Sequence, residues 1–214
     1  MVCWSTLPLN AQPFSIDRPD YTESPNLVGR GFVHLETGAS LPAKPTEWSG
    51  MIRLRLAEKV EVRSTLIHPG GVELGAKWVI LRSDKNRLAW INHIRPVGWQ
   101  GFRSVLSGEH SLGDYTLGWN LGHQRPLTDA AAFSFFSHSH ALALSDRSTF
   151  FLEGVHSYPG GNAMEHGWTP LNTGFFYAIT PSVVVDAMLG LNPALKTAKY
   201  LVGCSFRLQT RKMY

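Results

Sequence analysis

The sequence has few cysteines and few charged residues, and it has no long apolar run. Its 214 residues include only Cys3 and Cys204, too few for a disulfide framework or for a zinc site of recognisable spacing. Charged residues make up 17% of the chain, below the usual value of about a quarter. No apolar stretch reaches the roughly 18–20 residues of a membrane-spanning helix. Cysteine-rich secreted domains and helical membrane proteins are therefore excluded.

Basic residues are not clustered either. The 20 Lys and Arg residues outnumber the 16 Asp and Glu residues but are spread along the chain, so we expect no nucleic-acid partner. The glycine runs at 69–71 and 159–162 lack the following helix that a phosphate-binding loop requires. Helical periodicity is not visible in any segment, and we expect no cofactor.

Alternation of apolar and polar residues is the dominant pattern from Gly31 onward. Residues 51–56 read MIRLRL and residues 72–80 read VELGAKWVI. A period of two gives an extended strand one apolar and one polar face. The pattern predicts twelve strands, at 30–42, 48–56, 60–67, 72–82, 87–95, 99–106, 112–122, 129–143, 148–157, 168–179, 183–190 and 199–208.

The connections between these strands largely alternate between short turns and longer Gly- and Pro-containing loops. Such alternation is typical of an up-and-down barrel with tight turns at one rim and loops at the other. The strands are close to the 9–11 residues that a tilted membrane strand needs. We therefore predict an all-β, antiparallel transmembrane β-barrel of about 12 strands over residues 29–214, preceded by an N-terminal segment, residues 1–28.

Periodicity alone does not say which face of the barrel is apolar. In a soluble barrel the charges point outward, and the protein could act as a binding or structural scaffold. In a membrane barrel the apolar residues contact lipid. Aromatic residues such as Trp78, Trp119 and Tyr200 fall mostly on apolar faces, many near strand ends, as interfacial aromatic girdles do. A twelve-stranded soluble barrel would also be too wide to fill with side chains. The sequence favours a barrel in contact with outer-membrane lipid.

In that orientation the charged faces line the interior of the barrel, the lumen. Five acidic and five basic residues are predicted to line it: Glu36, Arg53, Arg55, Glu61, Arg63, Glu73, Lys77, Glu153, Asp186 and Arg207. Their balanced charge is compatible with two roles. The lumen either conducts water and small-molecule solutes, with the charges setting ion preference, or is closed by its own ion pairs.

The segment SHSH, residues 137–140, could be taken for a metal or hydrolase site. His138 and His140 share one strand face, as two metal ligands would. Ser137 or Ser139 beside a histidine could form a nucleophile and base pair. No third ligand at a fixed spacing accompanies the histidines, so we expect neither a metal site nor an enzyme.

The segment DRPDYTESP (17–25), followed by GRGFVHLETG (29–38), resembles the start of the outer-membrane transporter family named for a MetA pathway of phenol degradation. That family is related to the functional-amyloid exporter barrels. Weaker matches follow in order over residues 15 to 208: LRLAEKVEVR (54–63), LGAKW (74–78), WNLG (119–122), LSDR (144–147), Glu153 and GCSFRL (203–208).

The resemblance implies a twelve-stranded barrel in the bacterial outer membrane that takes up or exports small molecules, with hydrophobic or aromatic compounds as candidates. A polypeptide-export barrel is an alternative. The polar stretch before the first strand, with Asp17, Arg18, Asp20 and Glu23, is expected either to pack in the periplasmic mouth as a plug or only to cap the first strand.

The chain departs from the family pattern in two places. The region after residues 96–98 is short, which predicts a short sixth strand, and the last strand ends on Leu208 rather than on an aromatic residue. The first residues, MVCWSTLPLNAQPF, are either the remnant of a secretory signal or a short disordered N-terminus.

Overall fold

Twelve antiparallel strands form a closed barrel in the computed structural model, which describes residues 16–17, 20–41, 47–98, 101–127, 132–158 and 169–210. The strands are β1 (Phe32–Leu41), β2 (Glu47–Ala57), β3 (Val60–His68), β4 (Gly71–Arg82), β5 (Asn86–Gly98), β6 (Gly101–Leu112), β7 (Tyr115–Pro126), β8 (Phe133–Ser145), β9 (Ser148–Ser157), β10 (Leu171–Thr180), β11 (Val183–Asn192) and β12 (Thr197–Gln209).

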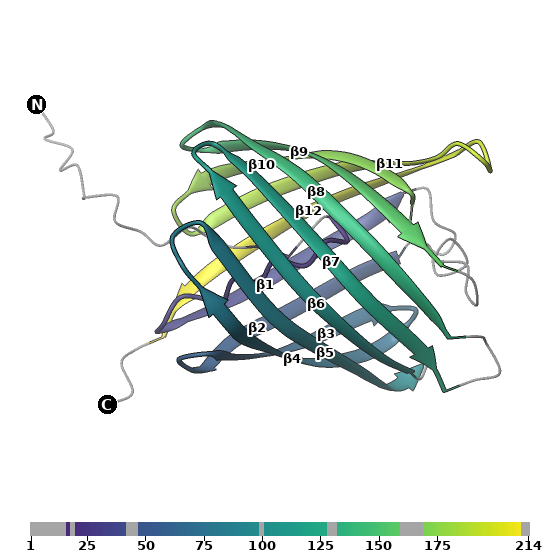
Figure 1. The fold of residues 1–214 in the computed structure, drawn as a ribbon, viewed down its shortest axis with the longest axis horizontal. Coiled ribbons are helices and arrows are strands. Elements are labelled where there is room, and N and C mark those ends of the chain that lie inside the picture. The colour runs from purple at the N-terminus through teal and green to yellow at the C-terminus, as the bar shows by residue number, and fades with distance from the viewer. Residues whose placement is uncertain are drawn as a thin grey trace, which may run out of the picture.

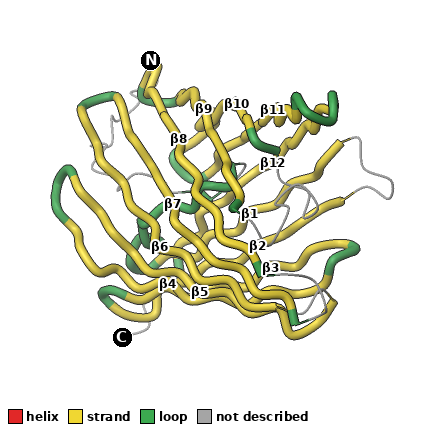
Figure 2. Tube along the Cα trace, turned by 45° about the vertical axis from the view of Figure 1, so that its right-hand side comes forward, coloured by secondary structure: helices red, strands yellow, loops and turns green. Residues whose placement is uncertain are grey.

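Each strand pairs with its sequence neighbours, and β1 closes the barrel against β12 (Figure 1). In Figure 1 the strands of the barrel wall are steeply tilted, and purple β1 lies beside yellow β12. Figure 2 shows strand over most of the described chain. The predicted antiparallel twelve-stranded barrel is confirmed. No helix suited to crossing a membrane is found in the described ranges.

The barrel end opposite the start of β1 has two short connections, β3 to β4 and β5 to β6, among longer ones. The connections at the end where β1 begins and β12 ends are all tight turns. They connect β2 to β3, β4 to β5, β6 to β7, β8 to β9 and β10 to β11. Gly113, with a φ of 62°, provides the left-handed backbone that the turn after β6 requires. Short turns are typical of the periplasmic side of an outer-membrane barrel, so this end is the periplasmic one.

Strand β6 is longer than the sequence predicted. It runs for 12 residues to Leu112, whereas the pattern predicted an end at residue 106. Gly108 interrupts the apolar face of the strand, but the Trp119 ring of β7 covers it so closely that a Cβ at Gly108 would lie 2.2 Å from the ring. The Trp119 ring thus covers the position where Gly108 has no side chain, and β6 continues through it to Leu112.

The apolar residues face outward and the charges face inward. Trp78 and Leu56 are each 61% exposed on the outer surface, whereas Arg53 and Lys77 are completely buried inside the barrel. A soluble barrel would have the reverse arrangement, so that alternative is wrong. An outer surface of this kind belongs in contact with lipid.

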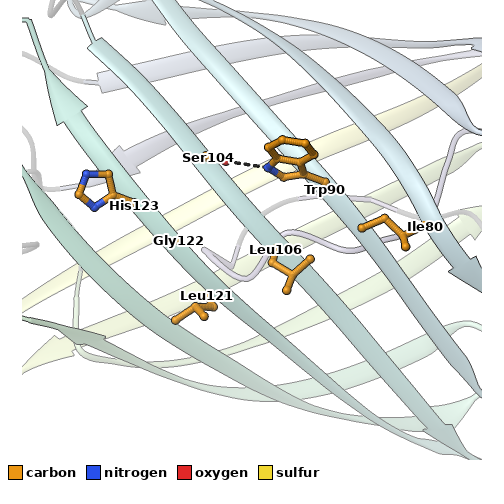
Figure 3. Close-up of a pocket in the computed structure, with 7 residues that line it drawn as sticks. All are labelled: Ile80, Trp90, Ser104, Leu106, Leu121, Gly122 and His123. Atoms are coloured by element: carbon orange, nitrogen blue, oxygen red, sulfur yellow. Dashed lines mark hydrogen bonds between the residues drawn. The ribbon is translucent and has the colours of Figure 1, made fainter.

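The aromatic girdle expected from the sequence is only partly formed. Trp78, Trp90 and Trp119 lie within β4, β5 and β7 rather than at strand ends. Trp90 donates a hydrogen bond to Ser104 Oγ at 2.7 Å on the outer surface (Figure 3). The hollow drawn there, of about 500 Å³, is lined by Ile80, Trp90, Ser104, Leu106, Leu121, Gly122 and His123. It opens on the lipid side and is not a lumen site.

Candidate functional site

The polar segment before β1 lies inside the barrel. We call residues 16–31 the preface, of which all but residues 18 and 19 are described. The preface makes polar contacts with inward-facing side chains of β1 to β6, β8 and β9. The wall residues that take part include Glu36, Arg53, Glu61, Arg63, Lys77, His93, Arg103, Ser107, Glu109, Ser137 and Glu153. The preface therefore contacts the inner wall on eight of the twelve strands.

Asp17 of the preface is surrounded by three cations of the wall. Its carboxylate lies 2.8 Å from Arg63, 3.1 Å from Lys77 and 3.5 Å from Arg53. Its backbone N–H donates to Glu36 Oε2 at 3.0 Å. All of these side chains are buried, so the ion pairs are shielded from water and are strong only while every partner is present.

Glu23 of the preface has a second set of partners. Its carboxylate lies 2.8 Å from Arg63 and 3.0 Å from both Arg103 and His93. Arg63 therefore contacts both preface carboxylates, with Nη2 on Asp17 and Nη1 on Glu23. The two ion-pair clusters are joined through this one guanidinium group.

Hydrogen bonds hold the middle of the preface to the wall on β8 and β9. Glu153 Oε1 accepts from the backbone N–H of Tyr21 at 2.9 Å and from that of Thr22 at 2.6 Å. The Thr22 hydroxyl contacts Ser137 Oγ at 2.9 Å. Asn172 donates to the other oxygen of Glu153 at 2.8 Å. The preface is thus fixed from both sides of the lumen.

The preface carboxylates have shifted pKa values. Burial alone would raise the pKa of Glu23, but His93, Arg103 and Arg63 lower it to about 2. Burial opposes ionisation of Asp17 as well, but Arg53, Lys77 and Arg63 hold its pKa well below the usual range. Burial and the nearby carboxylates of Glu153 and Asp17 instead raise the pKa of Asp20. Asp17 and Glu23 are thus the charged anchors of the preface.

Most of the predicted lumen residues are buried and face inward. This holds for Glu36, Arg53, Glu61, Arg63, Glu73, Lys77, Glu153 and Asp186. Arg55 does not join the cluster on the second to fourth strands. It donates to the carbonyls of Ala57 and Glu58 at the hairpin turn, because β2 reaches its turn two residues later. Arg207 lies near the same rim and bonds the Pro181 carbonyl at 2.6 Å. Arg18 lies outside the described residues.

The sequence prediction missed the charged and histidine residues on the inward faces of β5 and β6, which are Arg87, His93, Arg95, Arg103 and Glu109. Arg95 and Arg103 lie 2.7 Å and 3.4 Å from the Glu73 carboxylate. The inward face of β5 also carries the buried apolar residues Ala89 and Ile91, and these hide its polar character. Arg87, His93 and Arg95 are separated by even numbers of residues and therefore share one face of the strand. This was the signal in the sequence that could have placed them in the lumen.

The SHSH segment does not form a catalytic pair. Ser137 and Ser139 face the lumen and are buried, whereas His138 and His140 are on the outer face of β8, with Nδ1 of His138 3.2 Å from Nε2 of His140. Adjacent residues of a strand point to opposite faces, so neither serine reaches these two rings. No set of three or more ligating side chains suited to a metal comes together in the described parts of the chain.

Comparison with solved structures identifies the architecture. The KdgM porin superimposes with a TM-score of 0.66 at 11% identity, covering 81% of this chain and 98% of that chain. A KdgM porin in complex with disordered oligogalacturonate superimposes with a TM-score of 0.62 at 11% identity, covering 82% of this chain and 98% of that chain. The fold is porin-like. Together with the apolar outer surface, this porin-like fold places the chain in the bacterial outer membrane.

No family model and no curated protein matches the sequence. Membership of the phenol-degradation transporter family therefore stays a prediction from the sequence motifs.

Proposed function

We propose that this chain is an outer-membrane channel for small solutes and that the preface closes its lumen at rest. The observation that carries the proposal is the path of the preface, which contacts inward-facing groups on β3 and on β9, two strands that are six positions apart around the twelve-stranded barrel. A segment anchored on both sides obstructs a pore between them. Solutes pass when the preface leaves its partners, and no enzymatic step is involved.

Hydrophobic or aromatic compounds are candidate solutes. Ile91, Val105, Phe133 and Phe135 form a buried apolar cluster on the inward faces of β5, β6 and β8. Such a cluster supports the passage of molecules with an apolar part beside the charged wall. The resemblance to the phenol-degradation family points the same way, but nothing among these residues specifies a phenol.

A permanently closed barrel with a structural role is the second candidate. It is favoured by the burial of the ion pairs that hold the preface, because separating buried partners is costly. The two candidates differ in whether any condition releases the preface. Export of a polypeptide has the family resemblance as its only support.

Acid should release the preface. The pKa of Glu23 is about 2 in the folded barrel, against a usual value of 4.5. A lowered carboxylate pKa contributes stability that is complete above about pH 4.5 and is lost as the pH falls toward about 2, a contribution of roughly 3 kcal/mol. The lowered pKa of Asp17 also stabilises the bound preface, and this contribution is lost at a still lower pH. The raised pKa of Asp20 acts in the opposite direction, because protonation removes its unfavourable buried charge.

The measurement is single-channel conductance of the refolded full chain, using material that shifts on boiling in a gel. We expect few steps between about pH 7 and pH 5, and frequent, reversible steps as the pH approaches about 2. An Asp17→Asn/Glu23→Gln variant should show its steps already at neutral pH. A folded barrel that is silent in both forms at every pH would favour the closed structural role.

A further inference from the structure

The barrel wall contains two buried pockets that bind carboxylates, and the preface fills both. The first consists of Arg53, Arg63 and Lys77 around Asp17. The second consists of Arg63, Arg103 and His93 around Glu23. Arginine is well suited to such sites because its fork of N–H donors matches the geometry of a carboxylate.

The wall has more cations than carboxylates in this region. The cations are Arg53, Arg63, Lys77, Arg95 and Arg103, and the wall carboxylates in contact with them are Glu36, Glu61 and Glu73. The two missing negative charges come from Asp17 and Glu23 of the preface. Once the preface leaves, Lys77 loses the Asp17 carboxylate, and Arg63 keeps Glu61 but loses both preface carboxylates. A buried cation that is short of negative partners is costly. Another anion is then favoured in its place.

We propose that these pockets form a recognition site for solutes with two or more carboxylates, and that the preface occupies it as an internal mimic of such a solute. The inference rests on the proposed function, because a solute that crosses the lumen must take the place of the preface. Arg63 links the two pockets, so one molecule with two carboxylates satisfies both and loses less translational freedom than two separate anions. A bound dicarboxylate competes with the preface and opens the channel.

Chemical rescue in the full chain tests the site. An Asp17→Ala/Glu23→Ala variant keeps the preface but empties both pockets. Glutarate should raise the temperature at which this variant loses its folded gel mobility, and titration calorimetry should show binding about tenfold tighter than to the unaltered chain. Butyrate at twice the concentration, which supplies the same number of carboxylates, should have a much smaller effect.

Two further variants make the test specific. Arg63→Gln in the double-alanine background should abolish glutarate binding. Glu109→Ala removes a lumen carboxylate outside the two pockets, which pairs with Arg87, and should not create a glutarate site. If the double-alanine variant fails to fold, Glu23→Ala alone, which empties the second pocket and leaves Asp17 in place, is titrated with butyrate instead, and Arg63→Gln should abolish that binding.

The outcomes separate the site from the channel. Arg63-dependent glutarate binding in a barrel that never conducts would support the site and overturn the proposed function. A conducting barrel that binds glutarate no better than butyrate, or equally well after Arg63→Gln, would support the channel and overturn the site. Glutarate binding together with a glutarate-induced increase in open time of the unaltered chain would support both.

Discussion

Deletion of residues 12–26 produces frequent, discrete conductance steps at neutral pH, where the full chain shows few. The deletion removes both carboxylate anchors, Asp17 and Glu23, and the Thr22 contacts with β8 and β9. The strands themselves are untouched, because β1 begins at Phe32. The barrel should still close through the pairing of β1 with β12. Single-channel recording in a planar bilayer measures the difference.

Folding of the deletion variant is checked by its shift on boiling in a gel. A variant that shifts normally but conducts no more than the full chain would show that the preface does not obstruct the lumen. It would then serve only to cap the first strand.

Arg53→Ala lowers the free energy of unfolding by about 3–5 kcal/mol. The side chain is completely buried and lies 2.8 Å from Glu36 and 2.9 Å from Glu61, with Asp17 at 3.5 Å. Its removal leaves carboxylates buried without their closest cation, and the loss comes from those unpaired charges. Urea unfolding followed by tryptophan fluorescence measures the change.

Lys199→Ala is the matched control. Lys199 lies 3.4 Å from Glu47, but both side chains are partly exposed, at 25% and 53%. Exposed pairs of this kind contribute about 1 kcal/mol or less. Equal losses for the two variants would mean that burial of the lumen network does not determine its strength.

The barrel could be predicted because its pattern persists along every strand. Residues 51–56 and 72–80 alternate over most of their length, and the structure places Arg53, Glu73 and Lys77 inward. The exceptions have local causes. In β6, the Trp119 ring of the next strand covers Gly108 on the outer face. In β5, the apolar residues Ala89 and Ile91 share the inward face with His93. A pattern read one strand at a time cannot show what the neighbouring strand supplies.

The partners of the preface were beyond the reach of periodicity. Thr22 bonds Glu153 across 131 positions of sequence, and Asp17 meets Lys77 across 60. These contacts depend on the register of every strand between them and on closure of β1 against β12. The plug hypothesis came from the family resemblance of residues 17–25, and no pattern in the chain paired Glu23 with Arg103.

A disulfide between the preface and the wall tests the central claim most directly. The hydroxyl oxygens of Thr22 and Ser137 are 2.9 Å apart, so the two side chains meet inside the barrel and cysteines at these positions would have their thiols side by side. Thr22→Cys/Ser137→Cys is made with Cys3 and Cys204 changed to Ser. We predict that the oxidised protein forms the cross-link and stays closed even in acid, and that reduction restores acid opening. A cross-linked barrel that conducts as well as the reduced one would contradict closure by the preface.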